Sequence, residues 1–361
     1  MKIVIDARES GSTTGRYVDK LIENLHILNP EFDFVVLTRP SRIEYMKTIA
    51  PKFEVVESDF KEFTYAEQIG FSKQLRALRA DLVHFTAAQQ PVLYRGKTIT
   101  TIHDLTTTRF RNPTKNSLVF SFKQLVYKWL VKRVARKSAH IIVPSKFVKK
   151  DVAQYAKINP HKITVTYEAA DYISDLAQPI KGLAPRSYIM YVGRPLPHKN
   201  LKRLMEAYSI IRNTRNNIKL VLVGKRDKLY EEHYHWASKE HIKGVVFTGF
   251  VSEGRLKWLY QNTAAYVFPS LSEGFGLPGL EAMAHRAPVV SSNASCLPEI
   301  YGEAAEYFNP ENILNMVEAI SHVIENPART QKLVELGSLQ AKKYSWRKMA
   351  EQTLAVYRQV S

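Results

Sequence analysis

Two glutamates, Glu273 and Glu281, stand eight positions apart in the stretch SEGFGLPGLEAMAHRAPVV, which covers residues 272–290. Three glycines and a proline lie between them, where a predicted buried strand, AAYVFPS, leads into a predicted helix. We expect this helix to begin at Pro278 and to hold Glu281 in its first turn. Glycine permits close backbone approach, and free amides at a helix N-terminus attract anions. The stretch therefore predicts a phosphate site with a carboxylate on each side.

Carboxylates accept hydrogen bonds from hydroxyl groups. Two carboxylates that flank a diphosphate site therefore suit a sugar on one side and a ribose on the other. They are too far apart in this arrangement for the paired carboxylates of a retaining hydrolase. The alternative is a purely structural role, in which both residues cap the helix and favour its dipole.

A second candidate anion site lies in the stretch GRPLPHKN, where Gly193 ends a predicted strand. The following loop presents Arg194 and Lys199 beyond the carboxyl end of that strand. Arginine can bind phosphate oxygens through two parallel hydrogen bonds, and lysine acts as a compact point charge. Together they could neutralise the charge of a departing diphosphate. The alternative is two surface cations in a loop.

The first half of the chain offers fewer candidates. His103 ends the predicted strand KTITTIHDL, and a histidine after a strand is either structural or catalytic. Asp104 can orient the loop or the imidazole. The stretch GSTTGRY supplies Gly11 and Gly15 after the first strand, but their spacing departs from the dinucleotide-binding pattern G-x-G-x-x-G.

The elements that position these residues alternate between strands and helices, and the pattern restarts near Arg186. Continuous apolar strands separated by helices predict parallel sheets covered on both faces. We therefore expect an α/β fold with two Rossmann-like, doubly wound domains that face each other across a cleft. The predicted divisions are an acceptor domain over 1–171, a linker over 172–186, a donor domain over 187–345, and a C-terminal helix over 346–361 that packs toward the first domain.

Several of these stretches together resemble the retaining glycosyltransferases of family 4, which have the GT-B fold. The most specific likeness is EGFGLPGLE followed by EAMAHRAPVVSS. It extends to YVGRPLPHKNLKRLMEAY, LVGK, FTGFV and the closing YSWRKMAEQTLAVY, and more loosely to TIHDL and VPSKFVKKDV in the first half. The resemblance covers nearly the whole chain.

The resemblance implies a role for each candidate. Glu273 would hold hydroxyls of the transferred sugar and Glu281 the ribose, while Arg194 and Lys199 would bind the diphosphate. Other residues would contact the donor less directly. They are His103 beside the sugar and phosphate, the backbone around Phe275, Gly276 and Leu277, the glycines Gly11, Gly15 and Gly193, and Phe250 and Val251 at the nucleobase.

We therefore expect a retaining transferase that moves a hexose from a nucleotide-diphosphate sugar to a hydroxyl of a lipid-linked or polysaccharide acceptor. The hexose would be of the mannose or glucose type, and the HKNL stretch favours mannose with guanine. No Asp-x-Asp metal motif accompanies the donor motifs, so we predict no metal site and no cofactor. The alternatives are a sugar-nucleotide epimerase or phosphorylase on this fold, a Rossmann oxidoreductase, and a non-catalytic nucleic-acid-binding protein.

Charge and composition add a predicted location. The chain has 361 residues, a formal net charge of +18 and one cysteine, Cys296, and its N-terminus does not read as a signal peptide. These features favour a reducing cytoplasm. The residues between Asp104 and Asp151 include twelve Lys and Arg and no acid. Since zinc-finger spacings, RNP-like signatures and basic tails are absent from the sequence, we predict no nucleic-acid partner.

The basic region includes a predicted helix over Lys115–Lys137. Its apolar side chains at helical spacing are Leu118, Phe122, Leu125 and Trp129, with Lys123, Lys128, Lys132 and Arg136 elsewhere. It is too short and too charged to span a bilayer. It could instead lie on an anionic membrane surface, which would make the enzyme peripheral on the inner face of the membrane. The alternative is a helix packed on the core with a solvated basic back.

Overall fold

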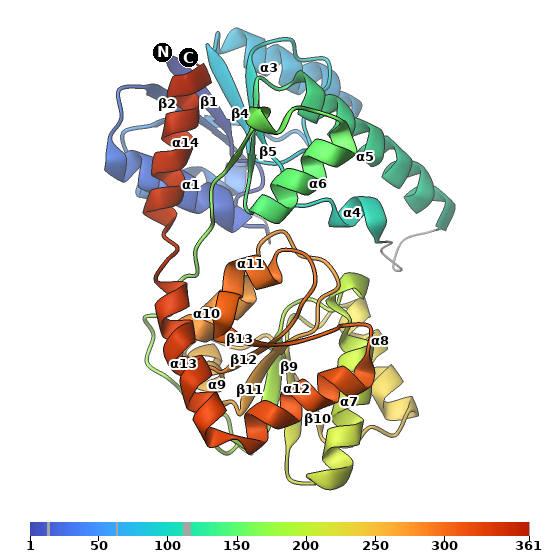
Figure 1. Cartoon of the computed structure of the whole chain (residues 1–361). Coiled ribbons are helices and arrows are strands. Elements are labelled where there is room, and N and C mark those ends of the chain that lie inside the picture. The colour runs from blue at the N-terminus through green and yellow to red at the C-terminus, as the bar shows by residue number, and fades with distance from the viewer. Residues whose placement is uncertain (13–14, 63, 111–116, 361) are drawn as a thin grey trace. The chain divides into compact units, whose positions relative to one another are not determined.

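The computed structural model describes residues 1–12, 15–62, 64–110 and 117–360, and these form two compact α/β units (Figure 1). In their described residues, unit 1 comprises Met1–Thr108, Ser121–Glu168 and Ser345–Ser361. Unit 2 comprises Ala169–Tyr344 with the described part of Arg109–Phe120. The segment 172–186, predicted as a linker, has no helix or strand and belongs to unit 2.

Unit 1 is built on a parallel sheet whose strand order is β3-β2-β1-β4-β5-β6-β7. The strands are β1 (Lys2–Asp6), β2 (Asp33–Thr38), β3 (Glu54–Glu57), β4 (Leu82–Phe85), β5 (Thr98–Thr101), β6 (His140–Val143) and β7 (Ile163–Val165). The central strands are buried along their length because helices cover both faces. This confirms the predicted doubly wound architecture for the first half of the chain.

The helices of unit 1 are α1 (Gly15–Leu28), α2 (Ile43–Ile49), α3 (Ser72–Ala77), α4 (Thr106–Arg109), α5 (Ser117–Lys137), α6 (Lys146–Ala156) and α14 (Trp346–Val360). The longer helices of unit 1 bury an apolar face, whereas the buried residues of α4 are threonines. In α1, for example, Tyr17, Leu21 and Leu25 are buried at helical spacing.

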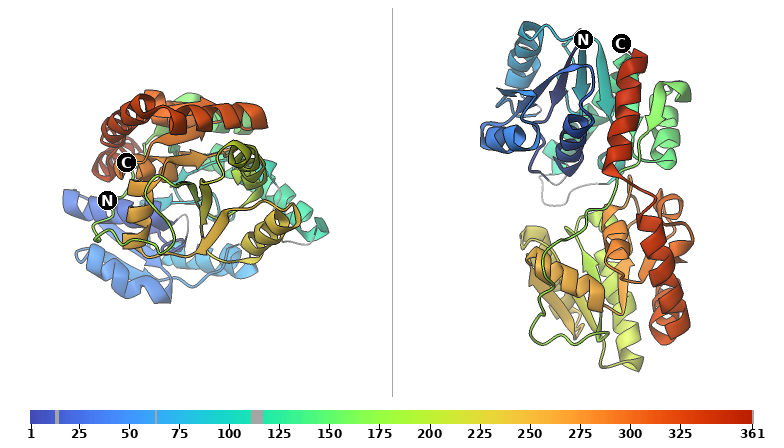
Figure 2. Two further views of the ribbon diagram at one scale, coloured as in Figure 1. Left: turned by 90° about the horizontal axis from the view of Figure 1, so that it is seen from below. Right: turned by 90° about the vertical axis from the view of Figure 1, so that its left-hand side faces the viewer.

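The last helix, α14, lies against α1 in unit 1 (Figure 1, Figure 2). Tyr357 is fully buried, and its hydroxyl lies 2.6 Å from Nδ1 of His84 on β4. At the surface Arg358 binds Glu31 through two hydrogen bonds of 2.8 and 3.0 Å. Residues from the far end of the chain therefore complete the core of unit 1.

Unit 2 has a parallel sheet of order β10-β9-β8-β11-β12-β13. Its strands are β8 (Tyr188–Val192), β9 (Lys219–Val223), β10 (Val245–Gly249), β11 (Ala265–Phe268), β12 (Val289–Ser292) and β13 (Ala305–Phe308). Its helices are α7 (Leu201–Thr214), α8 (Lys228–Lys239), α9 (Glu253–Asn262), α10 (Leu277–Ala284), α11 (Leu297–Tyr301), α12 (Ile313–Glu325) and α13 (Pro327–Ala341). The strand order reverses between β8 and β11, which is where doubly wound sheets bind ligands.

The basic helix packs differently from its sequence pattern. Leu125 and Trp129 were expected on one apolar face, yet both are largely exposed. The buried face is formed instead by Tyr127, Leu130, Val131, Val134 and Ala135, which pack into a core cluster with β6 and α6. Lys115 lies outside the described residues, and the side chains of Leu118 and Phe122 are not described. In the described part of the chain, no helix is long and apolar enough to cross a membrane.

Candidate functional site

The candidate site of unit 2 lies at the reversal of strand order. Strands β8 and β11 are hydrogen-bonded neighbours and run parallel, so the loops that follow them leave the same edge of the sheet. The two loops also bind each other. The amide of Leu271 donates to the carbonyl of His198 at 2.7 Å, and the Asn200 side chain donates to the carbonyl of Pro269 at 3.1 Å. The sheet thus unites two motifs that lie far apart in the sequence.

One residue from each loop meets at this edge. Nζ of Lys199 donates to Oε1 of Glu273 at 2.6 Å, and the two side chains are only 17% and 12% exposed. The ammonium group also lies 5.5 Å from the ring centre of Phe268, the last residue of β11. A partly buried cation therefore lies directly beside the carboxylate predicted to hold the sugar.

The Glu273 loop is held in place by two residues that the sequence analysis did not select. The amide of Glu273 donates to Oγ of Ser295 at 3.0 Å, and Sγ of Cys296 lies 3.3 Å from the Glu273 carbonyl as a weak donor. Burial raises the pKa of the Cys296 thiol, because the charged thiolate is disfavoured away from water. This cysteine is therefore a packing residue, and neither residue carries a motif that would reveal its role.

The glycine turn of the loop has the backbone that its sequence predicts. Gly276 precedes α10 with a φ of 93°, a conformation that favours glycine. A Cβ there would lie 2.6 Å from both Leu297 and the Tyr301 hydroxyl. The Tyr301 hydroxyl donates to the carbonyl of Gly276 at 2.6 Å. A side chain at position 276 would therefore collide with the packing of helix α11.

The start of α10 differs slightly from the prediction. The helix begins at Leu277, so Pro278 is its second residue and not its first. Glu281 is consequently its fifth residue and lies beyond the first turn, where we had placed it. Among the first three residues of α10, Pro278 has no N–H group and the Gly279 amide donates to the carbonyl of Gly276 at 3.2 Å. The Gly276 turn lies directly before this helix start, and an anion site there stays a prediction.

Arg194 leaves the end of β8 but does not contact the Lys199–Glu273 pair. Its Nε donates to Oδ2 of Asp227 at 2.6 Å, and its side chain is half exposed. Asp227 also caps α8 by accepting from the amide of Tyr230. Burial acts to raise the pKa of Asp227, but the Tyr230 amide and the Arg194 charge outweigh it, so that pKa is lowered. The cation predicted for the diphosphate is thus already paired.

The preceding residue, Gly193, has a φ of 143°. A Cβ there would lie 2.8 Å from the Tyr191 hydroxyl. Phe250 and Val251, predicted to contact a nucleobase, follow β10 at the edge of the sheet, and the Phe250 ring is 83% exposed. Strand β9 separates β10 from β8. A nucleobase contact by Phe250 stays a prediction.

In unit 1, His103 lies just beyond β5 with both ring nitrogens facing acceptors. Nε2 lies 3.0 Å from the carbonyl of Thr86, and Nδ1 lies 3.2 Å from Oε1 of Glu168. The ring of Tyr17 on α1 meets it edge-on, with 4.8 Å between the ring centres. A carbonyl and a carboxylate both require donors, so the geometry favours the doubly protonated imidazolium.

The electrostatics of His103 agree with its geometry. Burial acts to lower the pKa of His103, but the hydrogen bond and charge of Glu168 outweigh it, so that pKa is raised. The Thr86 carbonyl and Asp104 act in the same direction. Glu168 could not be found from the sequence, because a single acid after a short strand carries no recognisable signal.

The glycines of the first loop lie on the same side of unit 1 as His103, since Gly15 is the first residue of α1 and Tyr17 lies two positions on. A Cβ on Gly15 would collide with the Glu9 carbonyl. Gly11 has a φ of 76° and lies against the side chain of Arg42. Residues 13–14 between them lie outside the described part of the chain.

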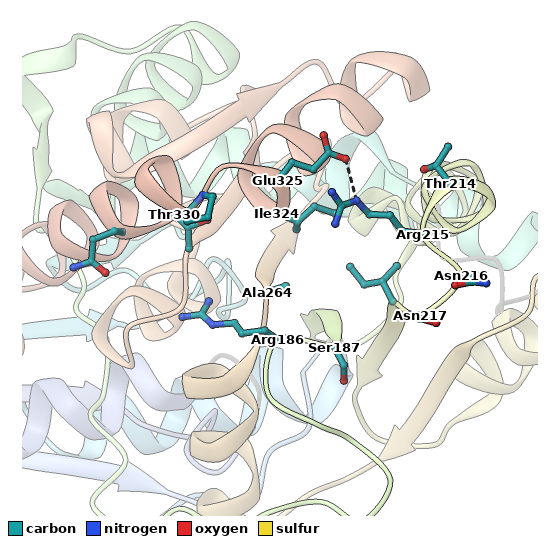
Figure 3. Close-up of a pocket in the computed structure, with 13 residues that line it drawn as sticks. Arg186, Ser187, Thr214, Arg215, Asn216, Asn217, Ala264, Ile324, Glu325 and Thr330 are labelled. Carbon is teal, nitrogen blue, oxygen red and sulfur yellow. Dashed lines mark hydrogen bonds and ion pairs between the residues drawn. The ribbon is translucent and has the colours of Figure 1, made fainter.

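A pocket of unit 2 lies elsewhere. It has a volume of about 890 Å³ and is lined by residues that precede strands, among them Ser187, Ile218 and Ala264 (Figure 3). Figure 3 shows Arg215 paired with Glu325 at its rim, with 3.0 Å between Nε and Oε1. This pocket opens at the amino ends of the strands, the edge opposite to Lys199 and Glu273. It contains none of the predicted site residues.

Sequence comparison gives the family. The model described as "Glycosyl transferases group 1" matches residues 178–339, and the model "Glycosyltransferase Family 4" matches residues 14–172. The chain belongs to these glycosyltransferases. The two matches divide the chain much as its structure does, and the predicted family is confirmed.

The family contains curated relatives of known name. The chain is 33% identical over 180 residues to an O-antigen chain mannosyltransferase B of Escherichia coli, covering 49% of this chain and 47% of that protein. It is 30% identical over 236 residues to the O-antigen chain mannosyltransferase RfbU of Salmonella typhimurium, covering 65% and 63%. The matches thus span between about half and two thirds of these relatives.

Solved structures support the fold. A sucrose-phosphate synthase from Thermosynechococcus elongatus matches with a TM-score of 0.78 and 19% identity, over 100% of this chain and 99% of that chain. HepE from Anabaena, solved in complex with UDP, matches with a TM-score of 0.74 and 15% identity, over 99% of both chains. These likenesses confirm the predicted GT-B fold.

Proposed function

We propose that this chain is a hexosyltransferase that takes mannose from a nucleotide-diphosphate sugar and adds it to a hydroxyl of a lipid-linked or polysaccharide acceptor. The observation that carries the proposal is the pairing of Lys199 with Glu273 at the reversal of strand order in unit 2. A cation suited to a diphosphate and a carboxylate suited to sugar hydroxyls lie within hydrogen-bond distance of each other. A sugar diphosphate carries an anionic diphosphate directly beside sugar hydroxyls, so it matches both side chains.

In this proposal, different residues of unit 2 bind different parts of the donor. The Gly276 turn and the backbone around Phe275 and Leu277 take the diphosphate, together with Lys199 and Arg194. Glu273 accepts hydrogen bonds from the sugar hydroxyls, and Glu281 accepts from the ribose. The predicted place of His103 beside the sugar remains part of the proposal, because that residue belongs to unit 1.

In this proposal, transfer keeps the configuration of the sugar. The bond between the anomeric carbon and the diphosphate oxygen breaks, and the acceptor oxygen bonds to the same face of that carbon. The proton of the acceptor hydroxyl passes to the departing diphosphate. Lys199 and Arg194 stabilise the negative charge that builds up on this leaving group. We propose that these cations act without a divalent metal.

The choice of mannose is supported by the names of the relatives, several of which are mannosyltransferases. Glucose-type donors are the second candidate, since HepE was also solved in complex with UDP-glucose. Thermal shift with GDP-mannose, GDP-glucose, UDP-glucose and UDP-galactose separates them. A ligand at 100 times its dissociation constant stabilises the folded protein by about 2.7 kcal/mol. A shift with none of the nucleotide sugars would contradict the proposal.

A second experiment separates transfer from the rival reactions. A transferase releases nucleoside diphosphate in proportion to an added acceptor, whereas an epimerase converts the donor without any acceptor. A phosphorylase requires inorganic phosphate. NMR of the new glycosidic linkage then gives its configuration. An inverted anomeric centre would contradict the retaining part of the proposal and leave the transfer itself intact.

A further inference from the structure

The exposed side of α5 has a regular organisation. Residues at positions 125, 128, 129, 132, 133 and 136 follow the spacing of one helical face. We call this face the α5 strip, and its members are Leu125, Lys128, Trp129, Lys132, Arg133 and Arg136. The apolar members lie toward the N-terminal end, and the cations extend toward the C-terminal end.

The opposite face holds α5 firmly on unit 1. Leu130, Val131, Val134 and Ala135 are buried in a core cluster that includes Ile141 of β6 and Val152 of α6. Apart from Arg136, which donates to the Ala156 carbonyl of α6, members of the α5 strip can be changed without removing a residue of this cluster. The strip faces outward because these residues, and not Leu125 and Trp129, form the core contact.

The apolar end of the α5 strip exposes to solvent side chains of types that are usually buried. Leu125 is 65% exposed and Trp129 is 53% exposed, and neighbouring Val126 is also exposed. Neighbouring exposed apolar side chains of this size mark interaction surfaces. Tryptophan in particular favours the boundary between lipid and water, because it combines a large apolar ring with a polar N–H group.

The basic end forms a pocket of about 340 Å³ that is lined by Trp129, Lys132, Arg133, Arg136 and Lys137. The guanidinium of Arg133 lies 5.9 Å from the Trp129 ring centre, within reach of a cation–π interaction. Partial burial lowers the pKa of Lys137, and the nearby charges of Arg133 and Arg95 add to that effect. The lining contains four cations and no acid, so it suits a phosphate group.

We propose that the α5 strip docks unit 1 on an anionic lipid bilayer, with Leu125 and Trp129 at the lipid boundary and the basic pocket on headgroup phosphates. The combination of features favours a bilayer over other anions. A free phosphate would need only the pocket, and a nucleic acid would gain nothing from Leu125. The docking rests on the proposed function only in its purpose, which is to reach a lipid-linked acceptor.

Three variants test the proposal. The charge variant Lys128→Gln, Lys132→Gln, Arg133→Gln spares Arg136 and Lys137, which donate to the carbonyls of Ala156 and Tyr94. The apolar variant is Leu125→Ser, Trp129→Ser. The matched control replaces three exposed lysines of unit 1 outside α5 with glutamine, namely Lys47, Lys52 and Lys61. It removes the same net charge as the charge variant.

The measurement is co-sedimentation at low salt with vesicles of phosphatidylcholine, alone or mixed with phosphatidylglycerol. We expect the wild type to bind the mixed vesicles, with a blue shift of tryptophan emission. Each cation near an anionic surface contributes about fivefold, so the charge variant should bind on the order of a hundredfold more weakly. The apolar variant should lose the shift and bind weakly. The control should bind as the wild type does.

Several results would overturn the docking. They are absence of wild-type binding, an equal loss in the control variant, undiminished binding of the apolar variant, or displacement from vesicles by millimolar inorganic phosphate. A single-stranded oligonucleotide that displaces the protein at moderate salt would instead indicate a nucleic-acid surface. Thermal shift with nucleotide sugars should be the same for all variants. Because sedimentation needs no activity, failure of the docking and failure of the transferase proposal are read separately.

Discussion

Lys199 and Glu273 form a partly buried ion pair between loops that are 74 residues apart in the sequence. In the proposed function one side chain belongs to the diphosphate and the other to the sugar. Donor binding must therefore either break the contact between Lys199 and Glu273 and replace it with contacts to the donor, or leave that contact intact. Each partner becomes an uncompensated charge when the other is removed. This relationship predicts different results for the two substitutions.

Replacing Glu273 with alanine should reduce turnover by on the order of 10²–10³ while the affinity for free nucleoside diphosphate stays equal or rises, because Lys199 is released from its partner. Lys199→Ala should lower both the turnover and the affinity for nucleoside diphosphate. The measurements are steady-state rates and calorimetric titration with nucleoside diphosphate. Weaker diphosphate binding by Glu273→Ala would contradict the division of roles.

Replacing Glu281 with alanine should weaken nucleotide binding itself by about 1.5–3 kcal/mol, the usual cost of a lost hydrogen bond to a charged group. Competition between the nucleoside diphosphate and inorganic diphosphate provides the control. Affinity for inorganic diphosphate, which has no ribose, should not change. Equal losses for both ligands would show that Glu281 does not contact the ribose.

Arg194 and Asp227 offer a matched pair of substitutions. Arg194→Ala should lower the rate, and added magnesium should not restore it. Asp227→Asn removes the competing charge while keeping an efficient helix cap for α8. It should leave diphosphate affinity unchanged or raise it. Rescue of Arg194→Ala by magnesium would reveal a metal requirement and contradict the metal-free proposal.

The pairing of loops in unit 2 shows what the sequence could and could not predict. Motifs alone placed Lys199 and Glu273 at carboxyl ends of strands, which proved accurate. Their direct contact follows from β8 lying beside β11, and strand order cannot be read from hydrophobic periodicity. Glu168 was missed for a related reason, since only the packing of unit 1 brings it to His103.

Helix α5 shows a different limit. Its sequence contains two sets of apolar residues at helical spacing, and either could have faced the core. Tertiary packing buries Leu130, Val131 and Val134 and leaves Leu125 and Trp129 outside. The helix itself could be predicted because its spacing and composition are local properties. Its orientation depends on partners both earlier and later in the chain, such as Ile102 and Ile141.

The pH profile of transfer should depend on Glu168. Its carboxylate raises the pKa of His103, so the cationic imidazole persists to higher pH than usual. If that cation supports transfer, the rate falls as pH rises through this pKa. Glu168→Gln should move the fall to lower pH. Asp104→Asn, which changes a weaker influence on the same ring, should move it less.

The buried residue His84 should make the folded protein less stable as the pH falls. Burial lowers the pKa of His84 to about 3, and the charge of His103 adds to this. The unfolded chain binds the proton below pH ~6.5 while the folded chain does not, so stability falls as pH decreases from about 6.5 to about 3. The slope for this one group is at most about 1.4 kcal/mol per pH unit.

His84→Gln removes that titration and should flatten the dependence, although it lowers stability at neutral pH. Tyr357→Phe removes only the hydroxyl partner and should lower stability without flattening the slope. Urea unfolding followed by circular dichroism at several pH values measures both. An unchanged slope in His84→Gln would show that other groups control acid unfolding.

The contact between Tyr357 and His84 has a consequence for biosynthesis. The chain leaves unit 1 at Glu168 and returns to it only at Ser345, so the ribosome synthesises all of unit 2 before α14 emerges. Until then β4 and α1 lack the helix that covers them. Nascent unit 1 should therefore remain open to proteases and chaperones while unit 2 is already able to fold, which reverses the usual order in which the N-terminal domain matures first.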